Sequence, residues 1–271
     1  GQTVKTYGGI EPRATIRYAI NDNSSIKAAI TRNLQYIHLV TNAGTTLPTD
    51  LWVPSTLRVQ PQKSWQYSAG YFKNFNNNMF ETSLEVYYKS MENQIEYREG
   101  FTPNTLNDAE EDFVFGKGWS YGGELFINKV KGRFTGWIGY TLSWTWRRFK
   151  DLNDNNKYPS RYDRRHDLSV VGTYELSKKW KLSSIFVYGT GQATSLPERF
   201  YFVNGVLTQE YSTINKYRLA PYHRLDFSAI YTPKAKVDRK YKSYWVFSIY
   251  NVYSRLNPYF VYYNQEGSVT T

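Results

Sequence analysis

Apolar and polar residues alternate one by one along several segments of this sequence. Residues 133–147 show the pattern most clearly. There, nearly every even position is apolar or aromatic, as at Ile138, whereas the odd positions are mostly polar, as at Thr141. Residues 166–176 and 180–188 repeat the alternation. A period of two places successive side chains on opposite faces of an extended chain, so the pattern predicts β-strands with one apolar and one polar face.

The same alternation predicts ten strands, at about residues 13–21, 25–39, 65–71, 80–89, 119–130, 133–146, 166–176, 180–188, 224–231 and 245–249. Short turns and long segments alternate between them. The long segments are expected to be loops, at Thr41–Ser64, Gln94–Gly118, Lys150–Arg165 and Gln192–His223. A soluble β-sandwich need not sort its connections in this way. Outer-membrane barrels do, with short periplasmic turns and long extracellular loops.

Strand length and aromatic content favour the same architecture. Transmembrane β-strands need about 9–11 residues and carry aromatic girdles at both interfaces, and here aromatic residues make up 18% of the 271 residues. The mean hydropathy of −0.62 and the lack of a long apolar run exclude a helical membrane span. A barrel is compatible with that hydropathy, since half of each strand faces a polar lumen. The predicted fold class is therefore all-β, an antiparallel transmembrane β-barrel.

The two faces of the predicted strands have different expected surroundings. We expect the apolar set to face lipid, at Ile138, Tyr140, Leu142, Leu168, Val170 and Tyr174. We expect the polar set to face the lumen, at Thr141, Ser143, Thr173 and Glu175. An arginine on the lipid face should then destabilise the barrel by about 2–4 kcal/mol at the bilayer midplane.

The chain is basic, with a formal net charge of +11, and it contains no cysteine. Its positive charges collect near strand ends, at residues 129–133, 178–181 and 234–242. No helix or groove motif gathers them, so we prefer outer-membrane lipid and lipopolysaccharide as partners over nucleic acid. The lack of cysteine excludes disulfides, thiolate metal sites and cysteine nucleophiles within this sequence.

Loop lengths also indicate how the chain would cross a membrane. The first predicted strand leads into a short turn, so it would run from the outside to the periplasm. The tenth strand leaves a short turn, so it would end outside. Both ends of the chain would then be extracellular, whereas a complete bacterial barrel has both ends in the periplasm. We therefore expect further strands before residue 1 and after residue 271, in a larger barrel.

Four motifs carry a resemblance to a known family. They are Tyr162–Asp167 (YDRRHD), Tyr121–Leu125 (YGGEL), Tyr222–Asp226 (YHRLD), and Tyr250–Tyr253 (YNVY) followed by Leu256–Pro258 (LNP). By the order of these motifs along the chain and their spacing, the sequence resembles the C-terminal half of a TonB-dependent outer-membrane receptor of the Bacteroidetes type. The resemblance covers essentially the whole chain.

The resemblance implies a barrel of about 22 strands with a plugged lumen, powered through TonB from the inner membrane. Residues 1–271 would supply strands twelve to twenty-one, without the N-terminal plug domain, the TonB-contacting region or the last strand. The implied location is the outer membrane of a Gram-negative bacterium. The implied function is active import of a nutrient, such as a glycan, a peptide or a metal chelate. A surface lipoprotein partner is implied by family analogy alone.

Some outer-membrane barrels are proteases, so candidate catalytic groups matter. The chain has three histidines: His38, His166 and His223. None has partners at metal-ligand spacing, so no metal site and no cofactor is predicted. Asp163, His166 and Asp167 allow a hydrolase hypothesis, but a charged anchor at the outer rim is favoured, in which Arg164 and Arg165 pair with carboxylates or lipopolysaccharide phosphates. We predict no catalytic residues, and a self-contained ten-stranded barrel enzyme such as a protease stays the alternative.

Ligand contact is expected at the outer ends of the strands, because a ligand arriving from outside meets the long loops before the plug. Aromatic faces suit apolar groups or sugar rings, and arginines suit anionic groups. The candidate substrate-binding residues are Trp52, Arg161, Arg164, Arg165, Phe200, Tyr201 and Tyr211. The alternative for the aromatic residues is that they pack loop against loop or lie in the interfacial girdle.

Overall fold

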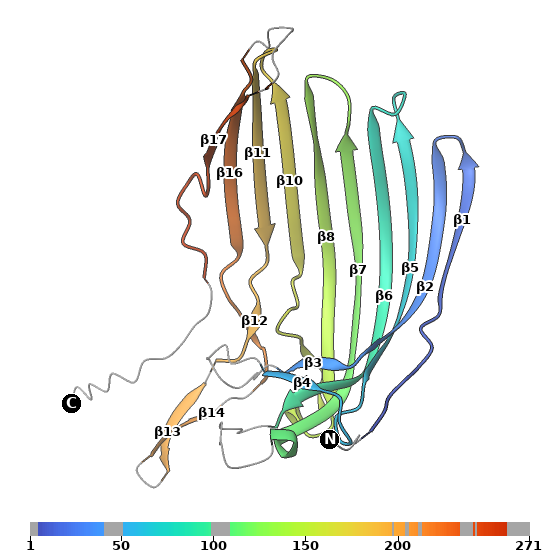
Figure 1. Cartoon of the computed structure of the whole chain (residues 1–271). Helices are drawn as coiled ribbons and strands as arrows, with labels where there is room; N and C mark the ends of the chain where they lie inside the picture. The colour runs from blue at the N-terminus through green and yellow to red at the C-terminus, as the bar shows by residue number, and fades with distance from the viewer. Residues whose placement is uncertain are drawn as a thin grey trace, which may run out of the picture.

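The computed structural model describes residues 5–40, 51–98, 109–196, 198–203, 206–210, 213–233, 241 and 243–258. Its main feature is an antiparallel sheet in which ten strands follow one another in chain order, and Figure 1 shows them side by side in a broad curved wall. The strands are β1 (Arg13–Asn21), β2 (Ser24–Gln35), β5 (Gln62–Phe75), β6 (Phe80–Tyr97), β7 (Phe113–Lys129), β8 (Phe134–Phe149), β10 (His166–Glu175), β11 (Trp180–Gly189), β16 (Tyr222–Tyr231) and β17 (Trp245–Ile249). The predicted all-β antiparallel fold is confirmed.

The register of the strands separates the two predicted faces. Ile138 of β8 lies opposite Ile127 of β7 and Val170 of β10. Thr141 lies opposite Glu124 on one side and Asp167 on the other. Because directly opposed residues share a face of an antiparallel sheet, the apolar positions form one continuous surface and most polar positions the other. That the apolar surface meets lipid stays a prediction.

The two ends of the sheet differ, as Figure 1 shows. At the upper end of the view, tight turns join the strands at residues 22–23, 76–79, 130–133 and 176–179; we name this the tight-turn end. Asn76, Asn77 and Asn78 take left-handed φ angles of 54°, 54° and 58°, a conformation that asparagine tolerates better than most residues. The local sequence is therefore sufficient to turn the chain there.

The opposite end, the loop end, carries accessory elements. They are β3 (Ile37–Val40) with β4 (Leu51–Pro54), β12 (Ala193–Thr194) with β15 (Tyr217–Arg218), β13 (Arg199–Val203) with β14 (Val206–Glu210), β9 (Tyr158–Pro159) beside β8, and the 3-10 turns η1 (Ala109–Asp112) and η2 (Asn153–Asn155). Within the described residues, no helix is long and apolar enough to cross a membrane. The long connections thus contain regular structure that period-two patterning did not predict.

Some predicted loop boundaries were wrong. β6 continues to Tyr97 and β7 begins at Phe113, well inside the expected loop Gln94–Gly118. A register shift between Met91 and Gln94, where Asn93 has a φ of 55°, interrupts the alternation in β6. One extra residue in a strand reverses which side chains face the core. β6 therefore extends beyond the point at which apolar and polar residues stop alternating in the sequence.

Candidate functional site

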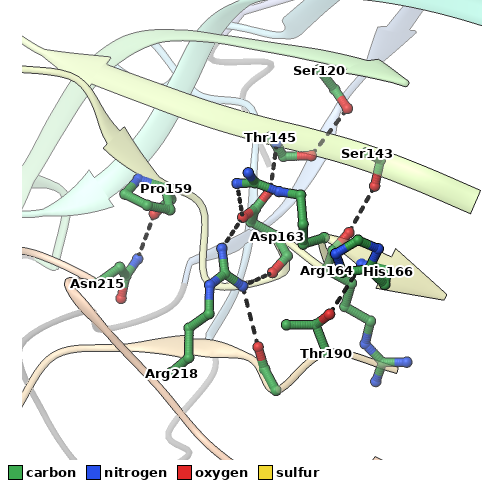
Figure 2. Close-up of polar contacts among 12 residues, drawn as sticks. Ser120, Ser143, Thr145, Pro159, Asp163, Arg164, His166, Thr190, Asn215 and Arg218 are labelled. Atoms are coloured by element: carbon green, nitrogen blue, oxygen red, sulfur yellow. Dashed lines mark hydrogen bonds and ion pairs between the residues drawn. The ribbon is translucent and has the colours of Figure 1, made fainter. Parts of the chain in front are cut away.

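Asp163 is the centre of a charged cluster at the loop end. Its side chain is 1% exposed, and it accepts a hydrogen bond of 2.6 Å from the backbone N–H of Thr145 in β8. The same carboxylate forms ion pairs with Arg165, at 3.4 Å, and with Arg218, which is 55 residues further along the chain. Figure 2 shows the Arg218 guanidinium directed at Asp163. A buried carboxylate requires such partners, and here they join three separate segments.

Arg218 extends this cluster to the next long connection. Its Nη1 donates to the backbone oxygens of Asp163, at 2.7 Å, and Gly191, at 3.2 Å. The neighbouring Asn215 is buried; its backbone N–H donates to Ser195 Oγ at 2.9 Å, and its Nδ2 donates to the Pro159 oxygen at 3.0 Å. The segments 150–165 and 190–218 are therefore tied together by backbone and side-chain contacts.

The remaining charged residues of the YDRRHD motif have partners of their own. Arg164 lies 3.5 Å from Asp167 in an exposed ion pair. His166 Nδ1 is hydrogen-bonded to the hydroxyl of Tyr140, at 2.8 Å. Asp163, His166 and Asp167 therefore do not form one hydrogen-bonded chain of the kind a hydrolase uses. The contacts match the favoured interpretation of the motif as a charged anchor.

Apolar residues fill the space beside this anchor. Phe149, Leu152 and Tyr158 are buried, and Val114 and Ile214 pack against them. The rings of Phe149 and Tyr158 lie 6.1 Å apart in a nearly parallel arrangement. β8, the segment that follows it and the 213–218 segment thus share one small core.

The β3–β4 hairpin folds back onto the sheet through a second core, formed by Val40, Val53, Val59, Ile95 and Phe113. His38 is fully buried, and its Nε2 lies 2.9 Å from Ser55 Oγ in a hydrogen bond. Its Nδ1 has no hydrogen-bond partner among the described residues. Burial lowers the pKa of His38, because an apolar surrounding disfavours the charged imidazolium. Packing of the β3–β4 hairpin therefore favours the neutral form of His38.

A third buried contact joins the ends of β6 and β8. Glu96 is 3% exposed and forms an ion pair with Arg147. The two residues are 51 positions apart.

On the exterior, Lys216 pairs with Glu198 at 2.7 Å, and this hydrogen bond together with the charge of Glu198 raises the pKa of Lys216. Charge pairing therefore continues from the buried layer to the surface of the loop end.

The predicted substrate-binding residues are spread over the loop end. Trp52 in β4 is 64% exposed, and Tyr201 in β13 is 46% exposed. Phe200 lies in β13, where its backbone is opposite Gln209, Arg161 is half-buried, and Tyr211 lies outside the described residues. Of these residues, Arg165 pairs with Asp163, whereas Arg164 pairs with Asp167. The Arg165 guanidinium also lies over the Trp144 ring, 4.6 Å from its centroid. A ligand-binding role for these seven residues stays a prediction.

The YHRLD and YNVY motifs contact each other at the far edge of the sheet. The Asn257 side chain donates to the His223 oxygen and accepts from the His223 N–H, both at 3.0 Å. Asp226 Oδ1 accepts the N–H of Asn251 at 2.9 Å. These side chains take the place of strand partners after β17 ends at Ile249. The motifs therefore hold an irregular segment against β16.

Sequence reasoning identified Asp163 but missed its principal partner. Arg218 and Asn215 lie in a segment without periodicity, and no local signal connects them to residues more than 50 positions earlier. Glu96 was missed for the same reason, because its partner Arg147 is 51 positions later. A buried ion pair between distant segments leaves no pattern in a single sequence.

A family model described as "TonB dependent receptor-like, beta-barrel" matches residues 1–253. Among curated proteins, none matches the chain. Solved structures share the fold. The ferripyoverdine receptor of Pseudomonas aeruginosa matches with 17% identity and a TM-score of 0.59, over 90% of this chain and 29% of that one. The E. coli K12 ferric-catecholate import receptor Fiu matches with 14% identity and a TM-score of 0.57, over 90% and 30%.

The ferric citrate transporter FecA, in its unliganded form, is a further match, with 12% identity and a TM-score of 0.57. The alignment covers 90% of this chain and 33% of that transporter. The chain thus spans about a third or less of the length of these solved structures. At such low identity, the likeness shows the fold alone.

Proposed function

Because the chain belongs to the TonB-dependent receptor β-barrel family, whose members lie in the outer membrane of Gram-negative bacteria, we propose that it forms the C-terminal half of the barrel wall in a nutrient importer. The plug, the TonB-contacting region and the last strand would come from other parts of the protein, which we place in the Bacteroidetes type of the family. The supporting observation is the difference between the two ends of one sheet, with tight turns at one end and ordered accessory elements at the other. We assign the loop end to the cell exterior.

The proposed ligand is bulky and polar: a glycan, a peptide or a metal chelate. Two of the matched receptors have iron chelates in their names, ferripyoverdine and ferric citrate, which supports the third class. At the loop end, Trp52 and Tyr201 present exposed aromatic faces, and Arg161 adds positive charge. The contacts of Asp163 and Arg218 hold the segments that carry Arg161 and Tyr201, and the core around Val53 holds β4, which carries Trp52.

The proposed partners are TonB, through the N-terminal region, outer-membrane lipid and lipopolysaccharide, and a surface lipoprotein that closes the loop end. The protease alternative has less support. The matched structures are receptors and transporters, and the arrangement of Asp163, His166 and Asp167 favours anchoring. No contact in the described residues favours a nucleophile.

The role of the loop end in ligand binding can be tested while the contacts of Asp163 and Arg218 are kept intact. In the full-length protein, residues Arg199–Glu210 are replaced by a short Gly-Ser linker, which keeps Ser195, Asn215 and Arg218 in place. A matched control carries Lys178→Gln and Lys179→Gln at the tight-turn end. Binding and uptake of candidate ligands by whole cells are measured with and without TonB.

We expect uptake to require TonB in the unmodified protein. Ligand affinity should fall in the hairpin variant and stay unchanged in the control, with both variants assembled in the outer membrane. Unchanged affinity in the hairpin variant and in deletions of the other long loops would move the ligand site to the plug. TonB-independent uptake would contradict the importer proposal itself.

A further inference from the structure

A basic pocket lies where the apolar face of the sheet approaches the loop end. Its open cavity of about 600 Å³ is lined by residues of β6, β7 and β8 and of the segment after β8, among them Tyr88, Trp119, Lys117, Arg148 and Lys150. Tyr88 is in the same alternating series as the apolar residues of β6. Tyr88 lies opposite Tyr121, and Lys117 lies directly opposite Arg148. The pocket therefore opens on the apolar face and not on the polar one.

The cations of this pocket are not neutralised by the chain. Within the described residues, Lys117, Arg148 and Lys150 form no ion pair, and Glu92, which also lines the cavity, is not within ion-pair distance of them. Like charges directly opposed across two strands destabilise a sheet. Lys117 and Arg148 therefore form an arrangement that a bound anion would stabilise.

Arg148 is held in position for such an anion. Its Nε donates to the backbone oxygen of Asn155 at 2.8 Å and to Asn155 Oδ1 at 3.1 Å. The two terminal nitrogens have no partner among the residues that the structure describes. A guanidinium fixed through Nε presents those nitrogens as a fork, which matches two oxygens of a phosphate.

The hollow itself is built from the backbone. A register shift between Met91 and Gln94 interrupts the pairing of β6 with β7 beside the pocket, and the Asn93 side chain donates to the Pro61 oxygen at 2.9 Å. At Gly116, which lines the pocket, a Cβ atom would come within 2.4 Å of the Arg148 oxygen. Only glycine allows β7 and β8 to approach so closely there. The pocket is thus a fixed feature of the three strands.

We propose that this pocket binds the phosphorylated sugar headgroup of an outer-leaflet glycolipid. Basic residues beside a membrane attract anionic headgroups, and the rings of Tyr88, Phe115 and Trp119 suit a sugar at the interface. The cavity lies within the range of about 300–1,000 Å³ that is usual for small-molecule sites. The apolar face below it, with Leu84 and Leu125 directly opposed, would receive the acyl chains. The assignment rests on the proposed function in one respect, namely that the apolar face meets the membrane.

The test uses the full-length receptor purified in detergent and native mass spectrometry to count bound lipid. The pocket variant carries Lys117→Gln, Arg148→Gln and Lys150→Gln, and a second variant carries Lys117→Gln alone. The matched control removes the same charge at the tight-turn end, with Lys131→Gln, Lys178→Gln and Lys179→Gln. The probes are lipopolysaccharide lipid with and without its phosphates, phosphatidylglycerol, and inorganic phosphate as a competitor.

We expect the triple pocket variant to bind the phosphorylated glycolipid about 10- to 100-fold more weakly, the single variant to be intermediate, and the control to bind as the unmodified receptor does. Equal binding by pocket variant and control, or equal binding of dephosphorylated lipid, would overturn the proposal. Equal binding of phosphatidylglycerol would show that the pocket accepts any anionic lipid, and that it does not select a sugar headgroup. Complete displacement by millimolar inorganic phosphate would make this a soluble-anion site. Ligand uptake by cells, measured in parallel, distinguishes a failure here from a failure of the importer proposal.

Discussion

The two ends of the same sheet hold their charges in opposite ways. At the tight-turn end, Glu175 and Lys181 pair at 3.2 Å with side chains that are 57% and 47% exposed. At the loop end, Asp163 is 1% exposed and pairs with two arginines, and Glu96 is equally enclosed against Arg147. At the tight-turn end, local residues turn the chain, and contacts between neighbouring turns, such as Lys131 Nζ to the Asn77 oxygen, are exposed. The loop end depends on buried contacts between distant segments. We infer that the loop end is built as a rigid platform.

Removing the central carboxylate should have the largest effect. Asp163→Ala leaves two partly buried guanidinium groups and one backbone N–H without their acceptor. The loop end should be destabilised by about 3–5 kcal/mol, seen as faster hydrogen exchange in β9, β12 and β15. The control is Glu175→Ala at the tight-turn end, where an exposed pair contributes about 0–1 kcal/mol. Equal effects at the two ends would contradict the comparison.

Charge on the apolar face should be the next most damaging change. Ile138→Arg places a cation on the surface that we assign to lipid, and should cost about 2–4 kcal/mol in a bilayer. Thr141→Arg, three residues further along β8, places the same charge on the polar face and should be tolerated. Urea-induced unfolding in lipid vesicles measures both variants. If both were equally harmless, the assignment of faces would be wrong.

A substitution at the β16–β17 edge of the sheet should destabilise the protein less than the two changes above. Asn257→Ala removes one donor and one acceptor from the backbone of His223, and should weaken the segment after β17 by about 1–3 kcal/mol. Asn128→Ala is the matched control, because it removes an exposed hydrogen bond to Glu81. Hydrogen exchange of the His223 amide reports the difference. Identical protection in the two variants would show that the Asn257 contacts do not hold this edge.

The smallest expected effect depends on pH. Burial lowers the pKa of His38 below its ordinary value of 6.5. When the β3–β4 hairpin is detached from the sheet, His38 binds a proton more readily than when the hairpin is packed. Packing of this hairpin is therefore fully stable above pH 6.5 and weakens as the pH falls below it. Hydrogen exchange of β3 amides at pH 7.5 and 5.5 should show this loss. In His38→Gln the dependence on pH should disappear, and its persistence would assign the effect to another group.

The contrast between the ends also explains what could be predicted. The strands and tight turns follow from alternation and from residues such as Asn76–Asn78, because both are local signals. The anchor does not, since Asp163 and Arg218 come together only when the sheet brings two long connections side by side. The YDRRHD motif indicated one half of that contact through its resemblance to a family. β4 was hidden in an expected loop, because a short accessory strand carries too few residues to show a period. Most of β3 lay inside the predicted strand 25–39, which the structure divides between β2 and β3 at Tyr36.

The central claim is that the loop end faces the outside of the cell. The chain contains no cysteine, so single cysteines can be introduced into it in the full-length protein, after replacing any present elsewhere. Tyr201→Cys marks the loop end and Lys178→Cys marks the tight-turn end, and intact cells are treated with a maleimide that cannot cross the outer membrane. We predict labelling at position 201 in intact cells, and at position 178 only after the outer membrane is permeabilised. Labelling of position 178 but not 201 in intact cells would contradict the account.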